Sequence, residues 1–166
     1  MLLALSRLES PVGRLVFAAD DSSLRALEFH ESEAGLRAKL DRSLPDARFA
    51  KGAAAFVTDA LCAYFAGEVA ALEGLSAEGA GTPFQRKVWA ALRTIPPGRT
   101  MSYRGLAQQI GCPGAFRAVG AANGQNPISL VVPCHRVIAA DGTLCGYGGG
   151  LWRKEWLLRH EGALLA

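Results

Sequence analysis

The segment MSYRGLAQQIGCPGAFRAVGAANGQN, residues 101–126, is the most informative part of this sequence about its architecture. Ser102 can cap a first helix and Gly111 can end it, because a serine hydroxyl accepts from first-turn amides and glycine terminates helices without strain. A further helix follows the turn GCPG and runs towards Asn126. Two short helices around such a turn, in a basic segment, predict a helix-turn-helix.

The later of these two helices has an unusual surface for a protein that reads DNA. Helices that read the major groove carry Arg, Asn or Gln at several exposed positions. Here Arg117 is accompanied mainly by alanine and glycine. A smooth face of small residues allows close approach to a minor groove, but it equally allows tight packing between helices. The sequence leaves both interpretations open.

Another helix start lies upstream, in TPFQRKVWAALRTI. Thr82 occupies the N-cap position, Pro83 the first helical position and Gln85 the capping-box position. The preceding stretch EGLSAEGAGT, residues 73–82, is small, polar and glycine-rich, which is typical of a linker. We therefore expect a domain boundary here, with one domain over 1–79 and a second over 80–166.

The N-terminal part is expected to contain a sheet and a helix. VGRLVFAA and SLRALEF flank the turn residues DDSS, which indicates a β-hairpin, and LLALSRLES can add a third strand. AAAFVTDALCAYFAGE predicts a helix that ends near Gly67 and has Cys62 in the core. The expected fold class is α+β, with an α/β domain followed by a mostly helical domain.

Composition and charge narrow the class of partner. The chain has 166 residues, half of them hydrophobic, and a net charge of +3. It has no apolar run long enough to span a membrane, and MLLALSRLES lacks the features of a signal peptide, so we expect no membrane partner. From Ala80 onward ten Arg or Lys face three Asp or Glu, a net charge of +7, which leaves −4 for the first half. The second half can therefore bind a polyanion such as nucleic acid.

The cysteines indicate a reducing compartment and no metal. There are four cysteines and three histidines, with no CxxC pair and no His at ligand spacing from a Cys. Without a secretory signal, reduced thiols in the cytoplasm are the default expectation. We expect neither a bound metal nor a cofactor.

The stretch LVVPCHRVIAADG, residues 130–142, places Cys134 beside His135 and Arg136. The apolar run before Pro133 predicts a buried strand that ends at the cysteine. A buried thiol is normally protonated and inert, so a nucleophilic role would need a base and cationic surroundings. Neighbouring side chains of an extended chain point to opposite sides, so contact with His135 would need a bent backbone or a bridging water. A buried cysteine with polar neighbours remains the alternative.

A histidine base needs an acceptor that orients its ring. The second half offers Asp141 in a solvated turn, Glu155 on an exposed helix face, and Glu161 just before a glycine. Elimination favours Glu161. The stretch GYGGG, residues 146–150, can be a flexible connector or a loop whose bare backbone amides approach a ligand.

Taken together, several motifs resemble the O6-alkylguanine-DNA alkyltransferases, a family of direct-reversal DNA repair proteins. The similarity extends from Thr82 to Leu165, and the N-terminal half matches only in general character. The resemblance implies a ribonuclease-H-like N-terminal domain followed by a winged-helix-like domain that carries the helix-turn-helix. The motifs, in chain order, are SYRGLA, FRAVG, NPIS, PCHRV, GYGGGLWRKEWLL and HEG.

The resemblance also implies an activity. An alkyl group on O6 of guanine, or on O4 of thymine, would pass irreversibly from duplex DNA to Cys134 after the base is flipped out. Such a protein acts once, needs no cofactor, and works as a monomer on double-stranded DNA containing O6-alkylguanine. The rival interpretations are a cysteine hydrolase, which would turn over, and a winged-helix regulator whose cysteine is merely buried or senses redox state.

The family's catalytic roles map onto four residues of this chain. By resemblance, His135 would deprotonate Cys134 through a water molecule. Glu161 would orient His135, and Asn126 would hold the water and the active-site loop.

The remaining roles concern the flipped base and the duplex. Tyr103 would donate to the base, and the backbone around Gly148 would donate to O6; the human member of the family has a serine at that position. The carbonyls of Cys134 and Val137 would accept from the exocyclic amine, and Arg117 would enter the base stack as a finger. The residues implied at the minor groove are Arg117, Ala118, Ala121, Ala122 and Asn123.

Overall fold

The computed structural model describes residues 1–29, 32–52 and 54–164 of the chain, which forms two compact units. The first comprises Met1–Ala80 together with Pro127–Val131, and the second comprises Gly81–Asn126 together with Val132–Ala166. The division expected from the sequence placed residues 127–131 in the second domain, whereas in the structure they belong to the first unit. Among the described residues, no helix has the length and apolar character needed to cross a membrane.

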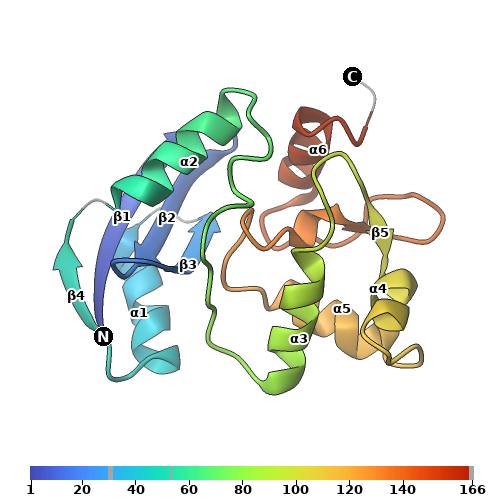
Figure 1. Cartoon of the computed structure of the whole chain (residues 1–166), viewed down its shortest axis with the longest axis horizontal. Helices are drawn as coiled ribbons and strands as arrows, with labels where there is room; N and C mark the ends of the chain where they lie inside the picture. The colour runs from blue at the N-terminus through green and yellow to red at the C-terminus, as the bar shows by residue number, and fades with distance from the viewer. Residues whose placement is uncertain (30–31, 53, 165–166) are drawn as a thin grey trace. The chain divides into compact units, whose positions relative to one another are not determined.

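The first unit is built on a four-stranded sheet with the order β3-β2-β1-β4 (Figure 1). The central pairings β1·β2 and β2·β3 are antiparallel, and β4 joins β1 in parallel. The hairpin and the third strand predicted from the sequence are thus confirmed. The strands are β1 (Leu2–Ser10), β2 (Gly13–Ala19), β3 (Leu24–Phe29) and β4 (Arg48–Lys51), and the helices are α1 (Glu33–Ser43) and α2 (Ala55–Phe65).

Strand β2 is buried from Leu15 to Ala19. Consecutive side chains point to opposite faces of the sheet, and in this strand the side chains on both faces are apolar. On one face, Val16 and Ala18 pack with Leu36 and Leu40 of α1 in a single apolar cluster. Removing this cluster from water supplies the main stabilisation of the sheet, at roughly 25 cal/mol per Å² of apolar surface. Helix α1 and strand β4 were not predicted from the sequence.

The expectation that Cys62 fills the core is wrong. Cys62 is exposed, whereas Val57, Leu61 and Tyr64 form the buried face of α2. Those three recur at spacings of four and three residues, which keeps them on one side of a helix. Cys62 follows Leu61 by one position, so its side chain is turned away by about 100°, the rotation per residue of a helix.

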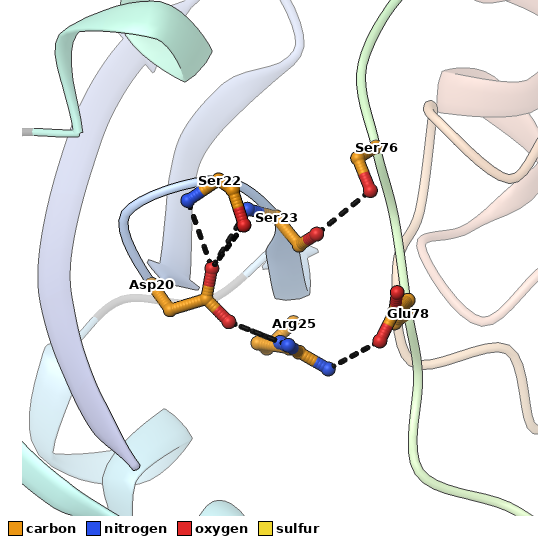
Figure 2. Close-up of polar contacts among 6 residues, drawn as sticks. All are labelled: Asp20, Ser22, Ser23, Arg25, Ser76 and Glu78. Carbon is orange, nitrogen blue, oxygen red and sulfur yellow. Dashed lines mark hydrogen bonds and ion pairs between the residues drawn. The ribbon is translucent and has the colours of Figure 1, made fainter.

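Part of the predicted linker is bound to the first unit rather than free (Figure 2). The amide of Leu24 donates to the carbonyl of Ser76 at 2.9 Å, and the amide of Glu78 donates to the carbonyl of Leu24 at 3.0 Å. The hydroxyls of Ser23 and Ser76 lie 2.7 Å apart. Since β3 is at the edge of the sheet, segment 76–78 covers backbone groups that would otherwise be unpaired.

An ion-pair cluster strengthens this attachment. Arg25 reaches Oδ2 of Asp20 at 2.5 Å with one guanidinium nitrogen and Oε2 of Glu78 at 2.8 Å with another (Figure 2). Asp20 also accepts from the amides of Ser22 and Ser23 at 2.9 and 2.8 Å. Partial burial raises the pKa of Asp20, but these amides and Arg25 outweigh it and lower the pKa from 3.8 to about 2.

The depressed pKa of Asp20 predicts a pH-dependent contribution to stability. Because the folded value of about 2 lies below the ordinary value of 3.8, the stabilisation is present above pH 3.8 and is lost as the pH falls towards 2. We expect Asp20→Asn to lower the free energy of unfolding by about 1–2 kcal/mol at pH 7, with the deficit shrinking in acid. Urea unfolding at several pH values measures this, with Asp21→Asn as the exposed control. A deficit that is the same at pH 7 and pH 2.5 would contradict the assignment.

The second unit is mostly helical and carries one short parallel sheet. The capping box of Thr82 and Gln85 is present as predicted, and Ser102 caps α4 by accepting from the amide of Gly105. Gly111 follows α4 with a φ of 77°, a conformation that glycine adopts without strain. The elements are α3 (Pro83–Leu92), β5 (Met101–Ser102), α4 (Tyr103–Gln109), α5 (Phe116–Gly124), β6 (Val137–Ile138) and α6 (Leu151–His160).

The buried strand predicted before Cys134 is not formed. Ile128 makes a single bridge to Leu27, with Leu27 donating to Pro127 at 3.0 Å and Ser129 donating to Leu27 at 2.9 Å. After this the chain turns, and Leu130 adopts a φ of 69°. Pro127 and Pro133 flank the apolar run and have no amide to donate, so a longer ladder is disfavoured.

Candidate active site

Cys134 begins a short 3-10 helix, Cys134–Arg136, instead of ending a strand. The tight turn is closed by the amide of Arg136, which donates to the carbonyl of Pro133 at 3.0 Å. Cys134 is 7 % exposed. Burial raises the pKa of its thiol, while a hydrogen bond with Asn126 and the charge of Lys154 act in the opposite direction. The resting thiol is therefore protonated, and a base is needed to activate it.

His135 and Glu161 form a fully buried pair. Nε2 of His135 lies 2.9 and 3.1 Å from the two carboxylate oxygens of Glu161. Arg136 donates to the same oxygens through Nε at 2.9 Å and Nη2 at 2.7 Å, and its Nη1 donates to the carbonyl of Ile95 at 2.6 Å. Burial raises the pKa of Glu161, but the hydrogen bonds from Arg136 and His135 outweigh it and lower the pKa to about 2. Glu161 is thus a carboxylate at neutral pH.

The carboxylate of Glu161 determines which nitrogen of His135 carries the proton. Because a carboxylate only accepts hydrogen bonds, Nε2 of a neutral His135 must be the N–H donor. Nδ1 then keeps its lone pair, and within the described part of the chain this buried atom has no hydrogen-bond partner. Burial lowers the pKa of His135, so the ring is neutral at pH 7 and Nδ1 can accept a proton.

Two asparagines approach the cysteine from the chain segment before it. Nδ2 of Asn126 donates to the carbonyl of Val132 at 2.7 Å, and the Asn126 side chain also hydrogen-bonds the Cys134 thiol. Nδ2 of Asn123 lies 3.5 Å from the carbonyl of Cys134, which makes a weak contact. Asn126 therefore fixes both the turn and the nucleophile.

Tyr103 is the first residue of α4 and is close enough to Cys134 for the charge of that cysteine to act on its pKa. Its hydroxyl donates to the carbonyl of Cys145 over a long 3.5 Å. Burial raises the pKa of Tyr103 to about 12, helped by the neighbouring thiols of Cys145 and Cys134. The hydroxyl is therefore a neutral donor at pH 7, and its weak present bond can be exchanged for a better acceptor.

Lys154 is a buried cation that sequence analysis did not identify. Its Nζ donates to the carbonyls of Val137 at 2.6 Å, Cys145 at 3.0 Å and Gly146 at 3.3 Å. Three N–H donors thus meet three acceptors, and this satisfies the ammonium in the interior. Lys154 connects the turn after Cys134 with the loop before α6, and its charge favours the thiolate form of Cys134. The only available signal was its position four residues after the glycine-rich stretch that ends at Gly150.

We expect Lys154→Met to slow reaction of the Cys134 thiol at least tenfold and to destabilise the fold, because the buried carbonyl of Val137 loses its donor, at a cost of about 1–3 kcal/mol. Single-turnover rates across pH would show the loss, with a higher apparent pKa for activation of the cysteine. Lys87→Met, on the exposed face of α3, is the matched control. An unchanged pH–rate profile would show that Lys154 acts on the fold alone.

Comparison with models of protein families shows the family of this chain. Residues 83–163 match the model of the 6-O-methylguanine DNA methyltransferase DNA-binding domain, and residues 4–76 match that of the same family's ribonuclease-like domain. The chain belongs to this family. The α+β fold predicted from the sequence is confirmed, with a ribonuclease-like domain preceding a helical DNA-binding domain.

Individual members of the methyltransferase family are similar over nearly the whole chain. The methylated-DNA–protein-cysteine methyltransferase of Shigella flexneri is 50% identical over 163 residues, 96% of this chain and 95% of that protein. Its counterpart in Mycobacterium bovis is 47% identical, covering 93% and 89%. The crystal structure of Mycobacterium tuberculosis OGT in complex with DNA is 43% identical, with a TM-score of 0.80 over 98% of this chain and 94% of that one.

The helix expected to face DNA divides into exposed and buried positions. Arg117, Ala118 and Ala121 of α5 are exposed. Ala122 and Asn123 are only 2 % and 6 % exposed. Both are packed within the unit: the carbonyl of Ala122 accepts from Nε1 of Trp89 at 2.8 Å, and Nδ2 of Asn123 lies 3.5 Å from the carbonyl of Cys134, so their expected contact with DNA stays a prediction. Helical periodicity places these two positions on the packing side of α5.

The remaining candidate groups lie on the loop and strand around the cysteine. Gly148 is exposed, and a Cβ built on it would meet no atom within 4 Å. The carbonyl of Val137 already accepts from Lys154, and the carbonyl of Cys134 accepts from the amide of Val137. A carbonyl oxygen has two lone pairs, and the second one of Cys134 is met only by the weak contact from Nδ2 of Asn123 at 3.5 Å, which a stronger donor can replace. Among the described residues, no group of three or more His, Cys, Asp or Glu is arranged to hold a metal ion.

Proposed function

We infer that this protein repairs DNA by transferring a methyl group from methylated DNA to one of its own cysteines, and we propose Cys134 as the acceptor. The arrangement of Cys134, His135 and Glu161 carries this proposal. It combines a protonated nucleophile, a neutral base with a free lone pair, and a carboxylate that orients that base. The names and the DNA-bound structure of the relatives support DNA as the partner.

The proposed reaction is an in-line displacement at the alkyl carbon. Nδ1 of His135 takes the thiol proton through a water molecule as Sγ of Cys134 attacks. The new S–C bond forms while the C–O6 bond breaks, and the electron pair remains on the guanine oxygen. Tyr103 donates a hydrogen bond to the departing base and reduces the charge that develops on it. General-base assistance of this kind typically contributes about 10²–10⁴-fold.

The substrate geometry proposed is an extrahelical base. A thiol as buried as that of Cys134 cannot reach O6 inside a duplex, so the alkylated guanine must leave the stack. Flipping costs a few kcal/mol, less for a poorly paired damaged base. Arg117 is the exposed cation proposed to fill the space that the base leaves, and Ala118 and Ala121 present a smooth surface for the minor groove.

The remaining parts of the proposal follow from this chemistry. A thioether is not a leaving group under these conditions, so the protein is consumed by one transfer. No cofactor is required, because the base and the nucleophile are both side chains. We propose that the protein acts as a monomer in the cytoplasm on duplexes that contain O6-alkylguanine. O4-alkylthymine is a second proposed substrate.

Mass spectrometry of the protein after incubation with methylated duplex DNA tests the proposal. The expected result is one methyl group per protein molecule, on the peptide that contains Cys134, with restored guanine in the DNA. The amount of repaired DNA should equal the amount of protein. Methylation of another cysteine would overturn the choice of nucleophile, and repair in excess of protein would indicate a turnover enzyme such as a hydrolase.

A further inference from the structure

An arginine at the start of α4 is held by an aromatic ring at the start of α5. The guanidinium carbon of Arg104 lies 4.8 Å from the centroid of the Phe116 ring. Arg104 directly follows Tyr103 in the chain, and Phe116 directly precedes Arg117. The contact therefore joins the residue next to Tyr103, which is proposed to bind the base, to the residue next to Arg117, which is proposed to enter the base stack.

The same two helices meet again one turn further along α5. A Cβ built on Gly120 would lie 3.7 Å from Cδ1 of the Tyr103 ring, an ordinary van der Waals distance, so the ring lies next to this turn of α5. Positions 116 and 120 are four residues apart and share one face of the helix. Tyr103 and Arg104 thus lie against consecutive turns of the helix that is expected to face DNA.

Arg104 has the properties of a phosphate-binding group. It is exposed, and within the described part of the chain it makes no ion pair with a carboxylate. A guanidinium held over an aromatic ring still has N–H groups available to a ligand, and two of them can bind two phosphate oxygens. Stacking also reduces the side-chain freedom that is lost on binding, so the contact with Phe116 prepares Arg104 for a ligand.

We propose that Arg104, held by Phe116, binds a DNA backbone phosphate beside the flipped nucleotide and so helps to position the damaged base at Tyr103. This inference rests on the proposed function, since it takes the extrahelical base as the ligand at Tyr103. Phosphate contacts fix the register of a protein on a duplex and carry no sequence information. Arg104 is therefore a positioning residue that acts on the duplex and not on the reacting atoms.

A second arginine–phenylalanine contact provides the matched control. Arg37 lies 5.1 Å from the centroid of the Phe49 ring, in the first unit. It is exposed in the same way, but it belongs to the half of the chain with a net charge of −4 and is remote in sequence from the proposed site. Arg37→Ala removes one positive charge and one ring contact, and it leaves α4 and α5 unchanged.

The test compares single-turnover transfer from a methylated duplex with transfer from free O6-benzylguanine, for wild type, Arg104→Ala, Phe116→Ala and Arg37→Ala. Arg104→Ala should lower the duplex rate constant about tenfold, the size of one lost charge-assisted hydrogen bond, with a much smaller loss on the free base. The salt dependence of duplex binding should weaken by about one unit of slope. Phe116→Ala should lower the duplex rate constant by a smaller factor. The variant that carries both Arg104→Ala and Phe116→Ala should be only slightly slower on the duplex than Arg104→Ala alone.

Three outcomes would overturn the inference. The first is a duplex rate constant for Arg104→Ala equal to that of Arg37→Ala. The second is a salt dependence of duplex binding equal to that of wild type. The third is an equal loss of rate on the duplex and on free O6-benzylguanine. The last would place Arg104 in the pocket and not on the backbone. Failure of wild type to accept a label from either substrate would instead refute the proposed function, so the two failures are distinguishable. Thermal melting of each variant checks that the exposed substitutions leave the fold intact.

Discussion

Cys134→Ala is expected to abolish alkyl transfer completely, with no labelled protein after incubation with methylated DNA. Alanine retains the small apolar volume of the buried site but provides no atom that can form a thioether. DNA binding should persist, because the exposed residues of α5 and the basic surface are unchanged. Gel shift with an alkylated duplex and mass spectrometry of the protein measure the two properties separately.

A second cysteine variant makes the prediction for Cys134 specific. Cys62 is an exposed thiol in the first unit, so Cys62→Ala should transfer alkyl groups at the wild-type rate. Label on the Cys134→Ala protein would show that another of the four cysteines accepts the group. Loss of DNA binding by the same variant would mean that the turn at residue 134 has collapsed.

Glu161→Gln should produce the second largest loss, about 10²–10⁴-fold in the transfer rate. Glutamine has nearly the same shape as glutamate but has no charge, and it can donate as well as accept. It no longer requires the proton of His135 to sit on Nε2, and it leaves the guanidinium of Arg136 buried without a counter-ion. Breaking a buried ion pair costs about 3–5 kcal/mol, so activity must be measured where circular dichroism shows that the variant is folded.

The pH profile separates a catalytic effect of Glu161 from simple destabilisation. In wild type the rate should rise with pH as His135 becomes neutral, at a pH below the ordinary histidine value of 6.5 because burial lowers the pKa of its ring. The Glu161 carboxylate raises that pKa, so its removal should move the rising limb to still lower pH. Glu155→Gln, in the exposed pair with Arg159 on the same helix, should change neither rate nor profile. A wild-type rate for Glu161→Gln would refute the proposed role of Glu161 in orienting His135.

Local signals explain which elements could be predicted from the sequence. Thr82 with Gln85, and Ser102 with Gly111, are capping residues whose effect is confined to one helical turn, and the helices begin and end where these residues indicate. The hairpin of β2 and β3 was likewise predictable from alternation around a turn. Each of these features depends on neighbours within a few positions of the chain.

The features that could not be predicted depend on distant contacts. The apolar run before Cys134 has the composition of a strand, but its pairing is limited to one bridge with Leu27. Lys154 has the composition of a surface residue, and only the three carbonyls that converge on it make burial possible. The proximity of Glu161 to His135 was expected by elimination among few acids, whereas the bidentate contact from Arg136 was not expected.

The two segments that cover β3 have a practical consequence for dividing this protein. Segment 76–78 pairs at Leu24, and segment 127–129 pairs at Leu27, so two distant parts of the chain cover the same edge strand. A gene fragment that ends at Ala80 would retain the first cover and lose the second, which leaves an open edge that promotes aggregation. A fragment that begins at Gly81 would carry residues 127–131 without the sheet they belong to. Split reporters and circular permutants of this chain should therefore be cut inside a loop of one unit, and not at the apparent linker.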